Sequence, residues 1–84
     1  MSNELKLYVK LWCPWCIRAE HWLNEHGYEY TQIDVEKTRA AYDEMIKLSG
    51  QRMTPTLVTA DGHVLPDFGP EELAPFFKQH QISP

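Results

Sequence analysis

Residues 12–18 of the chain read Trp-Cys-Pro-Trp-Cys-Ile-Arg (WCPWCIR) and contain both of its cysteines, Cys13 and Cys16. Two cysteines separated by two residues can form half of a metal site, a structural disulfide, or a disulfide that opens and closes during a reaction. The segments on either side of the motif help to separate these possibilities, because the reactivity of a cysteine depends on its surroundings.

The flanking segments place Cys13 at the N-terminus of a helix. Residues 5–9 alternate apolar and polar side chains, as in a strand, and from Pro14 to about His26 apolar residues recur at helical spacing before Gly27. Pro14 suits the first helical position, where an N–H group would be unpaired. The Cys13 sulfur then lies beside free N–H groups at the positive end of the helix dipole, which favours the thiolate.

Cys16 follows Cys13 by one helical turn, and side chains three residues apart on a helix are about 5 to 6 Å apart at Cβ. A small adjustment closes a disulfide from that distance. We therefore expect Cys13 to attack a disulfide and Cys16 to resolve the mixed disulfide that forms. Trp12 and Trp15 flank the pair, and Trp15 above all is expected to offer an apolar docking surface.

A zinc site would need two further ligands, for which His21 and His26 are the nearest candidates. On one helix, His21 is about 140° round the axis from Cys16, and His26 is too far along the axis to reach the same ion. A structural disulfide across so short a loop would stabilise the chain little. A redox-active pair is therefore favoured over both alternatives, and we expect no metal site.

The whole chain predicts the element order β-α-β-α-β-β-α. The first half of the chain predicts a strand at residues 5–9, a helix at 14–26, a strand at 28–35, and a helix capped by Thr38. The apolar residues of that second helix fall on one face and are Ala41, Tyr42, Met45, Ile46 and Leu48. The second half predicts a strand after Pro55, a turn at Asp61 and Gly62, a strand at 63–65, and a helix from Pro70 that contains Pro75. A parallel crossover followed by a hairpin requires a four-stranded mixed sheet flanked by three helices, in the α/β class. With Cys-x-x-Cys directly after the first strand, this is the thioredoxin-like layout.

Length and charge restrict the kind of protein further. At 84 residues, we expect one domain spanning residues 1–84. A net charge of -4 with scattered cations offers no basic surface to a nucleic acid or an anionic membrane. The N-terminus has no apolar signal segment, and no stretch is long enough to span a bilayer, so we expect a soluble, cytoplasmic protein that acts as a monomer.

Two segments resemble the glutaredoxin family. The CPWC motif resembles the Cys-Pro-Tyr-Cys active site of that family, Lys10 stands three residues before Cys13, where the family usually has lysine, and residues 52–55 (RMTP) resemble its Arg-Thr-Val-Pro segment. The resemblance extends over nearly the whole chain in the order and length of its elements. It implies that Thr54 presents its backbone to the cysteinyl part of glutathione, just before a cis Pro55.

The same resemblance implies that Lys10 and Arg52 bind glutathione carboxylates. At residues 65–73 (LPDFGPEEL), Leu65 and Pro66 replace the Gly-Gly of the family, whose amides hold the γ-glutamyl carboxylate. FGPEEL resembles instead the Gly-Phe-Arg-Pro end of the glutaredoxin-like redoxins that serve ribonucleotide reductase and take electrons from thioredoxin reductase. Asp67 and Phe68 of this segment are included among the expected substrate- or glutathione-binding residues.

The function implied is that of a dithiol thiol-disulfide oxidoreductase that reduces protein or glutathione mixed disulfides through Cys13 and Cys16. Glutathione is the expected reductant, and no tightly bound cofactor is expected. Two alternatives remain open, namely a redoxin reduced by thioredoxin reductase and a carrier of a 2Fe-2S cluster held by Cys13 and glutathione from two subunits. Neither nucleic acid nor membrane is an expected partner.

Overall fold

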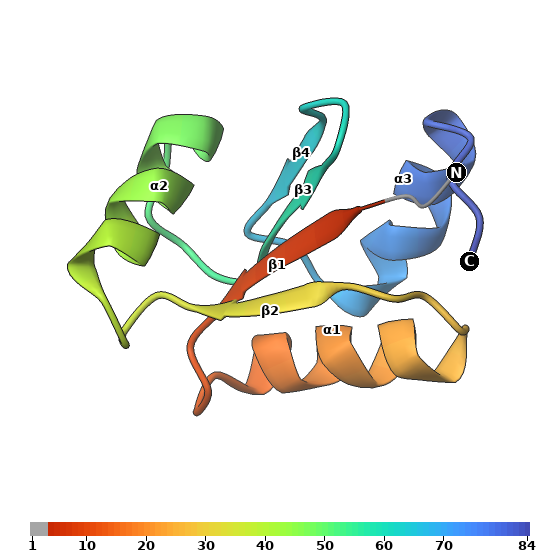
Figure 1. The fold of residues 1–84 in the computed structure, drawn as a ribbon. Helices are drawn as coiled ribbons and strands as arrows, with labels where there is room; N and C mark the ends of the chain where they lie inside the picture. The colour runs from red at the N-terminus through yellow and green to blue at the C-terminus, as the bar shows by residue number, and fades with distance from the viewer. Residues whose placement is uncertain (1–3) are drawn as a thin grey trace.

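The structure, a computed structural model, describes residues 4–84 (Figure 1). Its elements are β1 (Leu5–Val9), α1 (Pro14–Glu25), β2 (Thr31–Asp34), α2 (Arg39–Ser49), β3 (Thr56–Thr59), β4 (Val64–Pro66), the 3-10 turn η1 (Pro70–Glu72) and α3 (Leu73–Gln79). The sheet order is β2-β1-β3-β4, with β1 parallel to β2, and β3 antiparallel to both β1 and β4. This confirms the predicted four-stranded mixed sheet and its thioredoxin-like order.

The helices cover both faces of the sheet, with α1 and α3 on one face and α2 on the other (Figure 1). Alternate residues of β1 point to opposite faces, so Leu5, Leu7 and Val9 pack toward α1 and α3, whereas Tyr8 packs toward α2. The first cluster also contains Cys13, Cys16, Ala19, Leu23, Leu57, Phe68, Leu73, Phe76 and Phe77, and the second contains Val35, Met45 and Val58. Both cysteines therefore belong to the larger of the two buried clusters.

The pairing of the strands brings three loops to one end of the sheet. In the antiparallel register Tyr8, near the end of β1, lies opposite Thr56, the first residue of β3, and Thr56 in turn lies opposite Pro66, the last residue of β4. The loops that follow β1, precede β3 and follow β4 therefore meet where α1 begins. None of the helices within residues 4–84 is long and apolar enough to cross a membrane.

The alternating pattern predicts a strand at residues 28–35, but the second strand is shorter. β2 covers only Thr31–Asp34, because its pairing with β1 starts at Thr31, opposite Lys6. Tyr28 instead closes the end of α1 by donating its N–H to the carbonyl of Leu23 at 2.9 Å. Its ring stacks on that of Phe77 with 4.2 Å between centroids, so the apolar signal of Tyr28 reflects packing against α3.

The second helix begins and ends as predicted. The Thr38 hydroxyl accepts a hydrogen bond from the Ala41 N–H at 3.1 Å, and Gly50 ends the helix in the left-handed region at a φ of 72°. Leu48, on the face with Met45 and Ile46, remains 44% exposed. The buried cluster on this side of the sheet is small, and of the residues of α2 it buries only Met45.

The last helix begins later than Pro70. Residues 70–72 form a 3-10 turn in which the Glu72 N–H bonds to the Gly69 carbonyl at 3.0 Å, and α3 starts at Leu73. Pro75 has no N–H to offer to the carbonyl four residues before it, so the α-helical ladder cannot extend back through this turn. As the third residue of α3, Pro75 itself lies in the first turn, where the missing N–H is tolerated.

Candidate active site

Cys13 is the N-cap residue of α1, as predicted. Its backbone is extended, with φ of -74° and ψ of 121°, and Pro14 occupies the first turn of the helix. The Cys13 carbonyl accepts the N–H of Ile17 at 3.0 Å, and its N–H bonds back to the Lys10 carbonyl at 3.0 Å. The turn from β1 into α1 thus holds the sulfur at the end of the helix where N–H groups are unpaired.

The two cysteines differ in accessibility. Both are free thiols in the structure, yet Cys13 retains 9% of its surface and Cys16 only 1%. A disulfide that approaches from solvent therefore meets the sulfur of Cys13 first. Cys16 can react with a sulfur that is already bonded to Cys13.

The surroundings of Cys13 favour its thiolate. Burial by itself raises the pKa of the Cys13 thiol, but hydrogen bonds from the Cys16 N–H and thiol, the Trp15 N–H and the Thr54 hydroxyl outweigh it, and the pKa falls below its ordinary value. Most of these donors belong to the first turn of α1. The position of Cys13 at the N-cap is therefore the main reason for its acidity.

Cys16 shows the opposite behaviour. Burial raises the pKa of its thiol to about 11, although the Thr54 hydroxyl and the Lys10 N–H donate to its sulfur; Cys13 beside it raises the pKa further. The pair therefore combines the more exposed thiol, whose pKa is lowered, with a fully buried thiol, whose pKa is raised. This is the division between an attacking and a resolving thiol.

Thr54 lies next to both sulfurs, which the sequence-based prediction missed. Thr54 is only 8% exposed, and its hydroxyl acts to lower the pKa of both thiols. The Thr54–Pro55 peptide bond is cis, as the resemblance implies. A role for the Thr54 side chain had no signal in the sequence, because it depends on the pairing of β1 with β3.

Hydrogen bonds within residues 49–56 shape the loop that carries Thr54. The amide of Gln51 donates to the hydroxyls of Ser49 and Thr56, both at 2.8 Å, and its carbonyl oxygen accepts the Met53 N–H at 2.6 Å. The Thr56 hydroxyl then donates to the Met53 carbonyl at 2.7 Å. Gln51 is therefore a positioning residue for this loop.

Two cations lie over the tryptophans that flank the cysteines. The Lys10 ammonium is 5.7 Å from the centroid of the Trp12 ring, and the Arg18 guanidinium is 4.9 Å from that of Trp15. Trp12 also donates its indole N–H to a Glu36 carboxylate oxygen at 2.8 Å. Both rings are exposed, so apolar surface and positive charge lie together around Cys13.

Three more predicted site residues lie near this end of the sheet, but they differ in exposure. Arg52 is exposed on the loop before Thr54, and within residues 4–84 it forms no ion pair. Asp67 follows β4, is exposed, and adopts a positive φ of 47°. Phe68 is only 2% exposed and packs in the same buried cluster as the cysteines, so its side chain is part of the core and only its backbone could meet a ligand.

The start of η1 offers few free amides. The N–H of Gly69 donates to a Glu72 carboxylate oxygen at 2.8 Å, and Pro70 has no N–H. The Glu72 N–H in turn bonds to the Gly69 carbonyl. These reciprocal bonds satisfy the turn internally, so an anionic ligand finds fewer donors here than at an uncapped helix N-terminus.

Comparison with known proteins places this site in a family. The model of the glutaredoxin family matches residues 5–64. The chain belongs to the glutaredoxin family. It is 31% identical to glutaredoxin 3 of Escherichia coli (strain K12) over 76% of each chain, and 34% identical to a glutaredoxin of Neisseria meningitidis over 74% of each chain.

Solved structures show the same fold. The thioredoxin-like protein BC3987 superposes with a TM-score of 0.76 at 30% identity, covering 84% of this chain and 96% of that one. A glutaredoxin from Archaeoglobus fulgidus gives 0.78 at 21% identity, with 90% and 87% covered. The glutaredoxin-like NrdH-redoxin from E. coli gives 0.71 at 19% identity, with 86% and 92% covered. Membership of this family implies thiol-disulfide oxidoreductase activity.

The histidines near the motif of this glutaredoxin have partners of their own. The His21 ring contacts the Glu25 carboxylate one turn along α1. His26 stacks on the ring of Trp22 with 3.8 Å between centroids. Among residues 4–84, no group of three or more potential metal ligands comes together.

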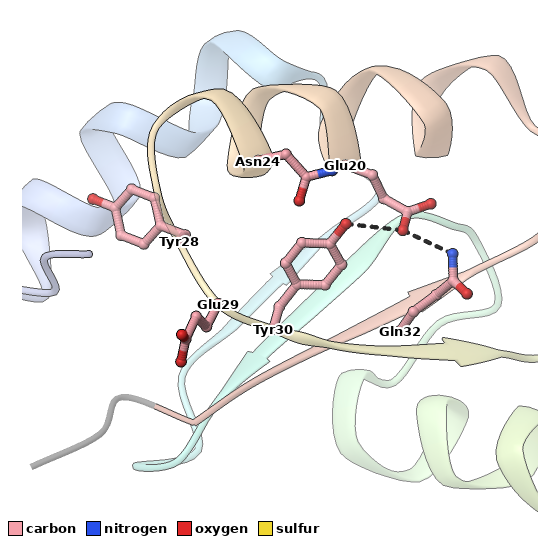
Figure 2. Close-up of a pocket in the computed structure, with 6 residues that line it drawn as sticks. All are labelled: Glu20, Asn24, Tyr28, Glu29, Tyr30 and Gln32. Atoms are coloured by element: carbon pink, nitrogen blue, oxygen red, sulfur yellow. Dashed lines mark hydrogen bonds between the residues drawn. The ribbon is translucent and has the colours of Figure 1, made fainter.

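A surface depression lies between α1 and the segment that leads into β2 (Figure 2). It is lined by Glu20, Asn24, Tyr28, Glu29, Tyr30 and Gln32. Figure 2 shows the Tyr30 hydroxyl and the Gln32 amide both directed at one oxygen of Glu20, at 3.0 and 2.8 Å. These bonds tie β2 and the segment before it to α1, so the depression has a structural role.

Proposed function

We propose that this glutaredoxin is a dithiol oxidoreductase that reduces disulfides of proteins and mixed disulfides of glutathione. Family membership supports the class of reaction. The observation that carries the dithiol mechanism is the contrast between Cys13, accessible and acidic, and Cys16, buried with a pKa of about 11. The pair can therefore take up a disulfide and release it in two ordered steps.

In the first step the Cys13 thiolate attacks one sulfur of the substrate disulfide. The substrate S–S bond breaks, a Cys13 mixed disulfide forms, and the departing thiolate takes a proton from solvent. Cys16 then loses its proton and attacks the sulfur of Cys13, and the second substrate thiol leaves with a proton. Two electrons have moved to the substrate, and a Cys13–Cys16 disulfide remains.

We propose glutathione as the reductant that restores the pair, since two molecules of glutathione supply two electrons and leave as glutathione disulfide. The Lys10 and Arg52 cations support this proposal, because they form no ion pair within residues 4–84 and could hold glutathione carboxylates. The backbone of Thr54 and the exposed Asp67 complete the proposed binding surface. In this proposal the protein is a cytoplasmic monomer without a tightly bound cofactor.

A second candidate is reduction by thioredoxin reductase. It is favoured by the turn at η1, where Pro70 lacks an N–H and Glu72 occupies the N–H of Gly69. Glutathione would lose donors for its γ-glutamyl carboxylate there, whereas a protein reductant does not depend on them.

One pair of assays separates the two reductants. The oxidised protein is supplied with glutathione, glutathione reductase and NADPH in one assay, and with thioredoxin reductase and NADPH in the other, with the same protein disulfide as substrate. NADPH consumption that depends on this protein in the first assay supports glutathione. Consumption in the second assay alone overturns the glutathione proposal in favour of the reductase.

A further inference from the structure

A groove lies between α1 and η1, on the side of α1 that faces away from the Glu20 depression. It is lined by Ile17, Arg18, His21, Trp22, Glu25 and Pro70, and its surface is mostly apolar. Ile17 is 54% exposed and contributes apolar surface to the groove. These six residues are called the α1 groove below.

The α1 groove begins about one helical turn after Cys13 on the same helix. Arg18 lines the groove and also places its guanidinium over the exposed ring of Trp15. Ile17, at the start of the groove, lies four residues after Cys13, which is about one helical turn. A chain that leaves the Cys13 sulfur along this side of α1 therefore passes directly into the groove.

The distances suit an extended polypeptide. With a helical rise of about 1.5 Å per residue, Ile17 and Trp22 lie about 6 and 14 Å along α1 from Cys13. An extended chain covers about 3.3 Å per residue, so side chains two to four positions from a cysteine bound at Cys13 reach the groove. Glutathione has one residue on each side of its cysteine and is too short to do so.

The charge of the groove selects among polypeptides. Arg18 forms no ion pair within residues 4–84, whereas the His21 ring and the Glu25 carboxylate at the far end contact each other. The end near Cys13 therefore carries the positive charge of Arg18, and the only carboxylate that lines the groove, that of Glu25, lies at the far end. An acidic residue close to the substrate cysteine, followed by an apolar residue, complements this arrangement.

We propose that the α1 groove binds an extended segment of a protein disulfide substrate that carries an acidic residue and then an apolar residue two to four positions from its reactive cysteine. The apolar side chain packs between Ile17, Trp22 and Pro70, and the carboxylate pairs with Arg18. This proposal rests on the proposed function, because it requires Cys13 to attack the substrate disulfide.

The test uses peptides whose single cysteine is disulfide-bonded to thionitrobenzoate. Reduced protein in excess attacks the peptide sulfur, the coloured thionitrobenzoate leaves, and Cys16 then releases the peptide thiol, so no external reductant is needed. The peptides are Leu-Asp-Gly-Cys-Gly-Asp-Leu, a neutral version with Ser and Asn in place of Leu and Asp, and a version with Lys in place of Asp. Their symmetry covers both directions of binding, and the glutathione mixed disulfide is the reference.

The wild-type protein is expected to react with the Leu-Asp peptide about tenfold faster than with the Ser-Asn peptide. Ile17→Ser is expected to reduce this ratio to about one, and Arg18→Glu to transfer the preference to the Lys peptide. Leu48→Ser is the matched control, because Leu48 is also exposed but lies on α2. It should leave the tenfold ratio unchanged.

Each result decides something. A wild-type ratio near one, or a ratio that Ile17→Ser and Arg18→Glu leave unchanged, overturns the groove proposal while the oxidoreductase proposal stands, provided that the glutathione reference reacts. If the wild-type protein releases thionitrobenzoate from none of the four disulfides, both proposals fail. Since the wild-type ratio is measured first, the groove remains testable even if one variant does not fold.

Discussion

The two sides of α1 use their polar groups in opposite ways. On the side toward β2, Glu20 accepts hydrogen bonds from Tyr30 and Gln32, so the depression in Figure 2 is satisfied from within. On the side toward η1 and at the N-terminal tip, Trp15 and Ile17 remain exposed and Arg18 has no ion-pair partner within residues 4–84.

This difference shows which side of the helix has capacity left for a partner. A polar cluster whose members bond to one another stabilises the fold and offers a ligand little. Exposed apolar surface beside an acidic thiol and an unpaired cation offers both binding and chemistry. The comparison predicts that substitutions at the tip change activity, whereas those in the Glu20 depression change stability.

The largest expected effect is that of Cys13→Ser at the tip. A hydroxyl is far less ionised and less nucleophilic than this thiol, so disulfide reduction should fall by at least about a thousandfold. Turnover of a glutathione mixed disulfide measures it. Circular dichroism should show an unchanged fold, and substantial activity in this variant would remove Cys13 from its assigned role.

The next effect is expected for Cys16→Ser. Cys13 still attacks, but the resolving thiol is missing, so a Cys13 mixed disulfide with the substrate should accumulate. Mass spectrometry without reducing agent detects the added mass, and a thiol reagent removes it. If no adduct forms while Cys13 is reactive, Cys16 is not the resolving residue.

The two thiols are also expected to differ in their pH dependence. The thiolate is the species that reacts, and the lowered pKa of Cys13 means that its thiolate persists to a lower pH than that of an ordinary cysteine. The rate of alkylation of Cys13 in Cys16→Ser should therefore rise with pH and level off at a pH below the ordinary cysteine pKa, which is about 8.5. Alkylation of Cys16 in Cys13→Ser should rise only above that range, since burial raises its pKa. The reverse order would contradict the assignment of attacking and resolving thiols.

The smallest effect is expected on the other side of α1. Glu20→Ala removes the acceptor for Tyr30 and Gln32 and should lower the free energy of unfolding by about 1 kcal/mol, with disulfide reduction unchanged. Glu29→Ala is the control, because Glu29 is exposed in the same depression and should change stability by less than about 0.5 kcal/mol. Chemical denaturation measures both. A loss of activity in Glu20→Ala would contradict the purely structural role assigned to the Glu20 depression.

Sequence patterns predicted the elements well where the signal was local. The capping Thr38, the turn at Gly50 and the hairpin at Asp61 and Gly62 depend on neighbouring residues, and the structure has each of them. The pattern was misleading at Tyr28, where an apolar residue packs on Phe77 instead of pairing in a strand. Periodicity shows that a residue is apolar, but it does not show what the residue packs against.

The sequence by itself determined the order of the elements, the family, and the position of Cys13 at the start of α1, because a strand, a Cys-Pro step and a helical pattern are contiguous in the chain. Only the tertiary structure decided that the Thr54 side chain lies beside both cysteines. It also decided that Pro70 faces α1 across a groove. These contacts follow from antiparallel pairing and helix packing, which bring distant segments to one end of the sheet, and no local pattern encodes them.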